Sequence, residues 1–313
     1  MASPVGRTVD GMASAMVLCA GLGTRLRPLT EELPKPLVPV GDRSLLAHVA
    51  GRLRAAGFSR AVVNTHHLPK AFANHLEEIP LEVQLVHEPV IRGTAGGVAG
   101  ARHLLGPGPV VVHNGDILAA APIRELLDSA GDGMCLAVAP RPAGQGSVGL
   151  AADASVVRLR GEVFGQEVAG GDYVGVAALG RRCLRELPDH GCLIGDWALP
   201  ELRLGRRLSS VATSTDWTDA GDPASYLAAN LSWLDRHCGR APAAWIDSQA
   251  RVEPGVTVER SLVGRGARVA GSGRLSHCVV WPGAVARAPL SSAVITAGGR
   301  VVQTAGEGAG QRA

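Results

Sequence analysis

A glycine-rich turn at residues 20–35, with the sequence AGLGTRLRPLTEELPK, has the residue types best suited to chemistry on phosphate groups. It combines glycines, a hydroxyl and cationic side chains, at Gly21, Gly23, Thr24, Arg25, Arg27 and Lys35. Glycine has no Cβ atom, so backbone N–H groups can approach phosphate oxygens closely. Arginine offers a forked set of donors that matches phosphate geometry. The turn therefore predicts a phosphate-binding loop; the alternative is a glycine turn with solvated arginines.

Short apolar runs alternate with helical patterns around this turn. Strands are expected at 15–20, 60–65, 81–87 and 109–113, and helices at 44–56, 69–79 and 97–105. This alternation predicts parallel βαβ units in a doubly wound α/β sheet. Ligands bind such sheets outside the carboxyl ends of the strands. The turn after Ala20 and the sequence Asn114-Gly115-Asp116 both follow strands, so we expect both at the ligand-binding edge.

The rest of the first domain, predicted over 15–240, has shorter strand patterns. They lie at 134–139, 147–151 and 172–179, and we interpret 131–218 as the substrate-facing half of the domain. A helix is expected at 223–237, because Asp222 is a good N-cap and Pro223 a good first helical residue.

The C-terminal region has a different spacing of apolar residues. It is predicted to be a separate domain over 241–313 with a flexible tail. Apolar residues recur six apart, with one slip of one residue, at Ile246, Val252, Val258, Val263, Val269 and Leu275. This step, with glycine corners, predicts a left-handed parallel β-helix whose apolar positions are buried; the alternative is a Val-rich β-sandwich. We expect Trp245 or Trp281 to pack on the first domain or on a second subunit, and so predict a homo-oligomer, with a dimer favoured.

Composition excludes several classes of protein. The 313 residues are 46% hydrophobic and 19% charged, which suits a chain with a sizeable core. The net charge of +3, without a basic block, argues against a nucleic-acid surface, and no run approaches the ~18 apolar residues of a membrane helix. Residues 1–14 lack a secretory pattern and are interpreted as a loose leader. The six scattered cysteines predict a reducing cytoplasm, without a disulfide framework or zinc site.

The complete signature resembles that of the sugar-1-phosphate nucleotidyltransferase family. That family carries a G-x-G-T-R-L-x-P-L-T loop followed by K-P-L-x-P-V, which here read GLGTRLRPLT at 21–30 and KPLVPV at 35–40. Further similar motifs follow in order: Glu88-Pro89 before GTAGG at 93–97, Asn114-Gly115-Asp116, and WTDAGDP at 217–223. The resemblance covers roughly 15–237 and implies a Rossmann-like, mixed and mostly parallel sheet. It also implies Mg²⁺-dependent nucleotidyl transfer from a nucleoside triphosphate to a sugar 1-phosphate, with release of pyrophosphate.

The resemblance also implies roles for individual residues. Asp116 and Asp219 are expected to bind Mg²⁺, Arg25 to hold the leaving pyrophosphate, and Lys35 to contact the α-phosphate or the sugar phosphate. The expected nucleotide-binding residues are Ala20, Gly21, Gly23, Thr24, Glu88, Gly93, Thr94, Ala95 and Gly96. The expected sugar-binding residues are Gly115, Gly149, Glu162 and Gly175. Asp222 stands where the family usually has Thr, which leaves open whether Asp219 or Asp222 is the ligand.

One departure from the family concerns the sugar. The usual E-K-P segment is missing; the region reads RLRGEVFGQE at 158–167, where Glu162 is a loose candidate and Arg158 or Arg160 could replace the missing cation. The favoured substrates are GTP with a mannose- or heptose-type phosphate, with UTP next. The alternatives are a non-catalytic regulatory paralogue that binds nucleotide sugars and, less favoured, a β-helix acyltransferase using His277. The adjacent His66 and His67 point opposite ways on an extended segment, which argues against a metal pair.

Overall fold

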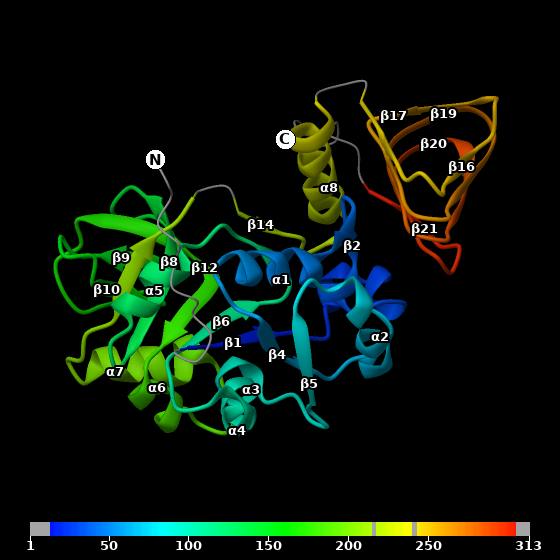
Figure 1. Ribbon diagram of the computed structural model, residues 1–313. Helices are drawn as coiled ribbons and strands as arrows, with labels where there is room; N and C mark the ends of the chain where they lie inside the picture. Colours follow the sequence, from blue (N-terminus) through cyan, green and yellow to red (C-terminus); the bar gives the residue numbers. More distant parts are fainter. Residues whose placement is uncertain (1–12, 215–216, 240–242, 305–313) are drawn as a thin grey trace, which may run out of the picture. The chain divides into compact units, whose positions relative to one another are not determined.

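The computed structural model describes residues 13–214, 217–239 and 243–304, which divide into two compact units (Figure 1). We call residues 13–21 and 46–218 the sheet unit, and residues 22–45 and 219–304 the repeat unit. Residues 1–12 of the predicted leader, the predicted domain boundary at 240–241, and residues 305–313, where the flexible tail is predicted, lie outside the described residues.

The sheet unit contains a parallel core in the order β6-β1-β4-β5. These strands are β1 (Ser14–Leu18), β4 (Arg60–Thr65), β5 (Glu82–His87) and β6 (Val110–Asn114). In β1, Met16 lies beside Val62 of β4 and Val112 of β6, and all three side chains are buried in one cluster. Strands β1, β4 and β6 are mostly buried, as expected for a parallel sheet, whereas the edge strand β5 has no buried residue.

Antiparallel strands extend the sheet beyond β6. They are β8 (Met134–Arg141), β9 (Val148–Leu150), β10 (Val156–Leu159), β11 (Glu162–Val163) and β12 (Ala169–Leu179), with β13 (Ser209–Ala212) added parallel to β8. Strand β12 pairs antiparallel with β6, β8 and β9. The predicted α/β fold with a mixed sheet is therefore confirmed. Two short strands stand apart from this sheet, β7 (Ile117–Leu118) and β14 (Thr218–Asp219).

Helices flank the sheet. They are α1 (Leu45–Ala55), α2 (Pro69–Asn74), α3 (Gly93–Gly100), α4 (Arg102–Leu105), α5 (Ile123–Ser129), α6 (Arg181–Glu186) and α7 (Leu199–Arg203), with a π-helical turn at Leu193–Ala198 and a 3₁₀ turn at Leu76–Glu78. Helix α5 contacts β8, β12 and β13 as well as β6. Figure 1 shows α1 on one side of β1 and β4, and α3 and α4 on the other. No helix of the described ranges is both long and apolar enough to cross a lipid bilayer.

Two helix predictions need correction. The helix expected at 69–79 ends at Asn74, and a separate 3₁₀ turn follows it. The helix expected at 97–105 begins four residues earlier, at Gly93, and breaks after Gly100. Glycine has a low helix propensity, which hid this start in the sequence. Contacts made by the tertiary fold override that propensity.

The repeat unit joins an N-terminal segment to the C-terminal part of the chain. Its segment 22–45 has 3₁₀ turns at Thr24–Leu26, Leu29–Glu31 and Lys35–Leu37, and the short strands β2 (Pro39–Val40) and β3 (Arg43–Ser44). Helix α8 (Pro223–Cys238) packs on this segment: the Tyr226 hydroxyl donates to the Pro39 carbonyl, and the Gly41 N–H donates to Asn230 Oδ1 at 3.0 Å. Tyr226 and Asn230 are both fully buried.

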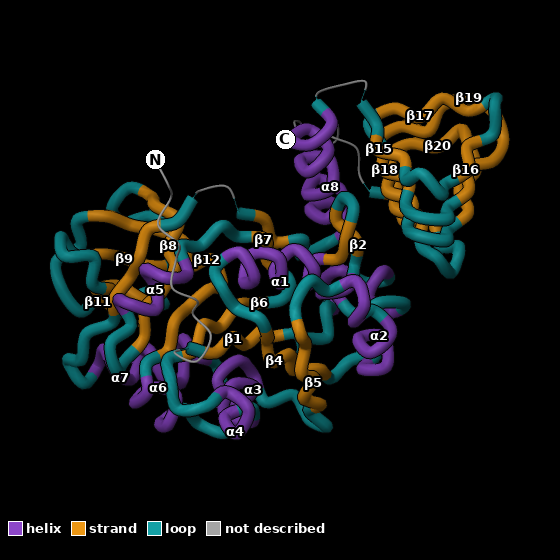
Figure 2. Tube along the Cα trace, viewed as in Figure 1, coloured by secondary structure: helices purple, strands orange, loops and turns teal. Residues whose placement is uncertain are grey.

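The C-terminal strands stack as parallel coils (Figure 2). They are β15 (Trp245–Ile246), β16 (Arg251–Val252), β17 (Val256–Glu259), β18 (Leu262–Val263), β19 (Arg268–Val280) and β20 (Val285–Ile295), and β21 (Val301–Gln303) pairs antiparallel with β20. The register pairs Ile246 with Val263, Val252 with Val269 and Val258 with Leu275, so one coil spans 17 residues. Three six-residue steps would make a coil of 18 residues, and the one-residue slip seen in the sequence reduces it to 17. This ladder is consistent with a β-helix.

Burial along the coils differs from the prediction in one place. Val269, Val263 and Leu275 are fully buried, as expected, but Ile246 is 44% exposed, and Val252 and Val258 are only partly buried. Ile246 and Val252 belong to the first coil, which has a neighbouring coil on one side only. Trp281 is buried, and its indole N–H donates to the Tyr226 hydroxyl at 3.0 Å. The sequence predicts packing of Trp281 on the first predicted domain or on a second subunit. Trp281 packs against α8, which lies within the first predicted domain.

Candidate active site

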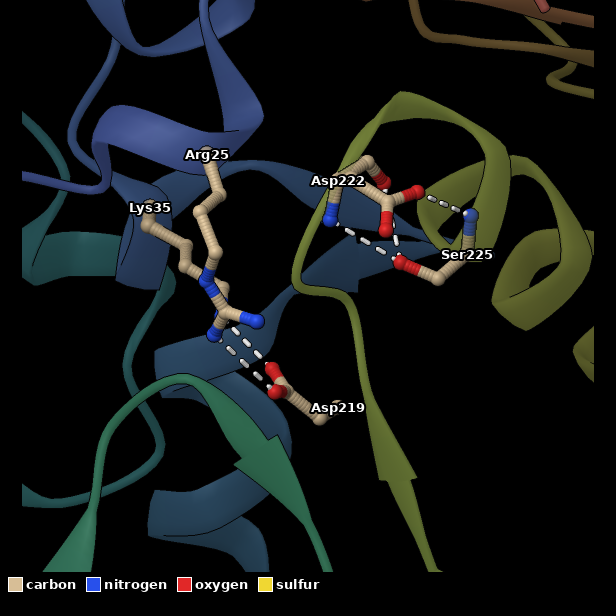
Figure 3. Close-up of polar contacts among 5 residues, drawn as sticks. All are labelled: Arg25, Lys35, Asp219, Asp222 and Ser225. Carbon is tan, nitrogen blue, oxygen red and sulfur yellow. Dashed lines mark hydrogen bonds and ion pairs between the residues drawn. The ribbon is translucent and has the colours of Figure 1, made fainter.

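Two cations and one carboxylate from distant parts of the sequence meet in the repeat unit (Figure 3). Lys35 Nζ donates to Asp219 Oδ1 at 2.7 Å, and Arg25 Nη2 lies 3.4 Å from Asp219 Oδ2. The Lys35 side chain is 6% exposed, whereas that of Arg25 is 72% exposed. A buried ammonium needs a paired anion, and Asp219 supplies it. The exposed guanidinium keeps donor capacity toward solvent, where an anionic ligand can bind it.

Local backbone structure sets the positions of both cations. Gly23 has φ +61°, and a Cβ atom there would lie 2.8 Å from Thr30 Cγ2. The Thr30 hydroxyl donates to the Gly23 carbonyl at 2.8 Å, which closes the loop around Arg25. Lys35 starts its own 3₁₀ turn between two prolines, whose fixed φ angles stiffen the chain. The loop therefore requires glycine at position 23 for conformational reasons.

Asp222 has a different task from Asp219. Its Oδ1 accepts from the Ser225 N–H at 2.9 Å, and the Ser225 hydroxyl accepts from the Asp222 N–H at 2.9 Å, forming a capping box (Figure 3). The predicted N-cap is thus confirmed. The bond from the Ser225 N–H, with smaller help from Arg25, lowers the pKa of Asp222. One oxygen of this carboxylate is committed to capping α8.

The turn after β6 holds Asp116 in the sheet unit. The Gly115 N–H donates to the Leu18 carbonyl at 2.9 Å, and a Cβ at Gly115 would collide with the Cys19 sulfur. Only glycine can therefore bring this turn so close to β1. Burial, and secondarily the charge of Asp116, raises the pKa of Cys19. Cys19 is consequently a neutral, inert thiol beside the turn.

Glu88 is one of the buried charged residues of the sheet unit, and Asn64 binds it. Asn64 Nδ2 donates to Glu88 Oε1 at 2.7 Å, and its Oδ1 accepts from the Cys19 N–H at 2.8 Å. Glu88 Oε2 accepts from the Arg92 N–H at 3.1 Å. Asn64 thus ties the end of β1 to Glu88 and to the start of α3. Sequence reasoning missed Asn64; the signal was a polar amide at the carboxyl end of a buried strand.

The sequence GTAGG forms the first turn of α3, and it packs tightly on a neighbouring loop. The Ala95 N–H donates to the Gly191 carbonyl at 2.8 Å, and the Leu193 N–H donates to the Thr94 hydroxyl at 2.8 Å. A Cβ atom at Gly96 would lie 2.5 Å from the Asp189 carbonyl oxygen. This close approach gives the glycines a packing role, whatever they bind.

Comparison with known proteins assigns the chain to a family. Residues 14–137 match the family described as nucleotidyl transferase. The chain is 35% identical over 239 residues to the N-acetylmuramate alpha-1-phosphate uridylyltransferase of Caulobacter vibrioides, covering 69% of this chain and 94% of that protein. The chain belongs to the sugar-1-phosphate nucleotidyltransferase family.

Two further similarities cover different shares of this chain. The probable mannose-1-phosphate guanylyltransferase 1 of Oryza sativa subsp. japonica is 28% identical over 90% of this chain and 85% of its own length. The crystal structure of HddC from Yersinia pseudotuberculosis superposes with a TM-score of 0.60 at 20% identity, over 71% of this chain and 100% of that chain. The structural likeness supports the nucleotidyltransferase fold. The rice relative is similar to this chain over a span that extends into the C-terminal repeat.

Three of the four predicted sugar-binding residues of this nucleotidyltransferase, Gly149, Glu162 and Gly175, lie on the antiparallel part of the sheet, and Gly115 lies in the turn after β6. Gly175 has φ +71°, and a Cβ there would lie 2.8 Å from Asn114 Nδ2, so glycine lets β12 approach the Asn114-Gly115-Asp116 turn. At Gly149, a Cβ would collide with the Glu167 carboxylate. Glu162 pairs with Arg203 on the surface, and this hydrogen bond lowers the pKa of Glu162.

The two arginines considered as replacements for the missing family lysine differ in their contacts. Arg158 binds both oxygens of Glu167, at 2.7 and 3.1 Å, and also donates to the Gly146 carbonyl at 3.0 Å. Arg158 therefore holds the turn at 142–147 and is committed to structure. Arg160 has φ +50° and donates to the Cys192 sulfur at 3.4 Å. Arg160 is the better candidate for a ligand-binding cation.

The environments of His66, His113 and His277 bear on the metal and acyltransferase alternatives. His66 Nδ1 is 2.7 Å from the Glu88 carbonyl, and His277 is exposed with φ +53°. His113 in β6 is fully buried, and burial lowers its pKa to about 4. Among residues 13–214, 217–239 and 243–304, no three metal-ligating side chains cluster. The isolated exposed His277 lends no support to acyltransferase chemistry.

Proposed function

We propose that this protein transfers a nucleotidyl group from a nucleoside triphosphate to a sugar 1-phosphate. The observation that carries the proposal is the cluster of Arg25, Lys35 and Asp219, which joins an exposed guanidinium to a buried ammonium at one carboxylate. A phosphate oxygen of the sugar 1-phosphate attacks the α-phosphorus of the triphosphate. A new P–O bond forms there, the bond to the β-phosphate oxygen breaks, and pyrophosphate leaves.

Both reactants are anions, so the residues of the chain act mainly by positioning them and by offsetting their charge. Arg25 binds the leaving pyrophosphate through its forked donors. Lys35, fixed by its proline-flanked turn, binds the α-phosphate or the sugar phosphate. The N–H groups of Ala20, Gly21, Gly23 and Thr24 bind the remaining phosphate oxygens. Positioning and charge neutralisation of this kind supply most of the rate in phosphoryl-transfer enzymes.

Magnesium is part of the proposal, with Asp116 and Asp219 as the carboxylates that hold it. A carboxylate offers about four lone-pair positions, and at Asp219 the two contacts from Lys35 and Arg25 leave acceptor capacity. Asp222 fits less well, because its Oδ1 caps α8, whereas Asp219 lies beside Arg25 and Lys35, the cations proposed to bind the phosphates. When bound, Mg²⁺ supplies charge neutralisation at phosphate oxygens. We propose Asp219 rather than Asp222 as the ligand.

For the nucleotide, we propose GTP with a mannose- or heptose-type 1-phosphate. The similarity to the rice guanylyltransferase supports this choice, since it extends over 90% of the chain. UTP is the second candidate, because the uridylyltransferase of Caulobacter vibrioides is more identical, at 35%, although over 69% of the chain.

An activity matrix tests the proposal. Each of the four ribonucleoside triphosphates and dTTP is paired with mannose-, heptose-, glucose- and N-acetylmuramate-type 1-phosphates, and pyrophosphate release is measured with Mg²⁺ and with EDTA. We expect turnover with GTP that EDTA abolishes and that the Lys35→Ala variant lacks. Turnover with UTP alone would move the assignment to a uridylyltransferase. Tight binding of a nucleotide sugar without turnover of any pair would establish the regulatory paralogue instead.

A further inference from the structure

The repeat unit contains a clasp between its C-terminal hairpin and the segment that bears Arg25 and Lys35. The turn at 296–300 links β20 to β21, and Glu32 accepts two hydrogen bonds from it. Glu32 Oε1 accepts from the Thr296 hydroxyl at 2.6 Å, and Oε2 accepts from the Gly298 N–H at 2.9 Å. Arg300 adds ion pairs to Glu32, at 3.4 Å, and to Glu31, at 2.6 Å.

The turn at 296–300, which binds Glu32, is held by hydrogen bonds of its own. The Thr296 N–H donates to the Arg300 carbonyl at 3.0 Å, and the Gly299 N–H donates to the Thr296 carbonyl at 3.0 Å. The Thr296 hydroxyl also accepts from the Arg300 N–H at 3.1 Å, and the whole residue is buried. A Cβ at Gly298 would lie 2.8 Å from the Glu32 carboxylate, so the turn fits closely around that group. Hydrogen bonds to an ionised carboxylate are stronger than neutral ones.

Glu32 lies in the sequence between the two cations of the candidate site. On its N-terminal side, the 3₁₀ turn at Leu29–Glu31 contains Thr30, which is buried and donates to the Gly23 carbonyl. On its C-terminal side, Lys35 follows three residues later. A shift of Glu32 would therefore move both the closure of the loop around Arg25 and the start of the Lys35 turn.

We propose that Glu32 is a positioning residue, through which the turn at 296–300 holds Arg25 and Lys35 in the geometry needed for turnover. The inference rests on the proposed function, and it assigns the C-terminal repeat a part in catalysis without giving it any atom that touches substrate. Misplacement of a phosphate-binding group by about 1 Å can lower a rate by up to ~10²-fold, so a small displacement is enough.

The repeat itself offers a matched control. Glu253 makes the same kind of clasp, since its Oε1 accepts from Arg268 at 2.6 Å and its Oε2 accepts from the Gly271 N–H at 2.7 Å. This clasp joins residues of neighbouring coils and involves no residue of segment 22–45. Glu253→Ala therefore removes an equivalent interaction away from Arg25 and Lys35.

The experiment compares the full-length wild-type protein with Glu32→Ala, Glu32→Gln, Thr296→Val and Glu253→Ala. Steady-state kinetics give kcat and KM separately, and amide hydrogen exchange gives the protection of residues 22–37. We expect Glu32→Ala and Thr296→Val to lower kcat about tenfold or more, with a smaller change in KM, and to speed exchange in that segment. Glu32→Gln, which keeps an acceptor, should recover part of kcat, and Glu253→Ala should leave kcat and this exchange near wild type.

Two results would overturn the proposal. One is an equal loss of kcat in Glu32→Ala and Glu253→Ala, which would indicate a general effect on folding. The other is an unchanged kcat and unchanged exchange in Thr296→Val. A wild-type protein without turnover of any substrate pair would refute the proposed function instead, while the exchange data would still show whether the turn holds residues 22–37.

Discussion

The two units hold their predicted site residues by different interactions. In the repeat unit, charged side chains pair with one another, as Lys35 and Arg25 do with Asp219. In the sheet unit, backbone turns and a buried amide hold most of them, as where Asn64 binds Glu88, and the exposed pair of Glu162 with Arg203 is the exception. The difference predicts that substitutions in the repeat unit act mainly on charge and turnover. Substitutions of the buried polar side chains of the sheet unit should act mainly on stability, because a buried polar group that loses its partner destabilises the fold.

The largest expected effect is on turnover in the repeat unit. Asp219→Asn and Lys35→Ala should each lower kcat by on the order of 10²-fold or more, because each removes a charge from the proposed transition-state environment. Pyrophosphate release measures this loss, and circular dichroism checks the fold. Asp222→Asn is the matched control, since asparagine also caps helices well and should preserve activity. A severe loss in Asp222→Asn, with normal turnover in Asp219→Asn, would reverse the ligand assignment.

The next effect concerns a neutral group buried in the sheet unit. The pKa of His113 is about 4 in the folded protein, below its ordinary value of 6.5. Between pH 6.5 and 4 the unfolded chain binds a proton at this position and the folded protein does not, so stability falls as the pH falls. At ~1.4 kcal/mol per pKa unit, the loss reaches roughly 3 kcal/mol near pH 4. Urea unfolding at a series of pH values gives the unfolding free energy of the wild type and of His113→Gln. Only the wild type should show this loss between pH 6.5 and 4, and an equal pH dependence of the two proteins would contradict the prediction.

A third test separates stability from turnover in the sheet unit. Asn64→Ala leaves a Glu88 oxygen and the Cys19 N–H without their buried partner, so the unfolding free energy should fall by about 1–3 kcal/mol. Below the unfolding transition, kcat should change less than in Lys35→Ala. Thermal unfolding and the pyrophosphate assay measure both quantities. If Asn64→Ala abolishes turnover at full stability, the contrast between the two units is wrong.

The smallest expected effect tests geometry at constant charge. Arg25→Lys keeps the positive charge but loses the forked donors, so turnover should fall by about tenfold, with normal folding. The Arg27→Lys variant is the control, because Arg27 is also exposed in the same loop. Equal, near-wild-type rates for both would show that Arg25 acts only as a charge, and would weaken the proposed pyrophosphate contact.

Much of the fold could be predicted from local pattern. Alternating apolar runs located β4 at 60–65 with its observed bounds, and the proline after Asp222 marked the start of α8. The six-residue step identified the apolar positions of the coils, and the structure shows which of them pair, such as Val252 with Val269. The start of α3 at Gly93 could not be predicted, because glycine opposes helix formation locally and the loop at 189–191 overrides it. The exposure of Ile246 follows from its place in the end coil.

The sequence by itself determined the elements, the family signature and the candidates for phosphate binding, because periodicity, capping and turn chemistry act over a few residues. Only the tertiary structure decided which carboxylate pairs with the cations. Lys35 and Asp219 are 184 residues apart, and Asp222, three residues further, caps a helix instead. The clasp from Thr296 to Glu32 spans 264 residues. Such contacts depend on how folded elements pack against one another, and the spacing of residues along the chain does not show which distant residues will meet.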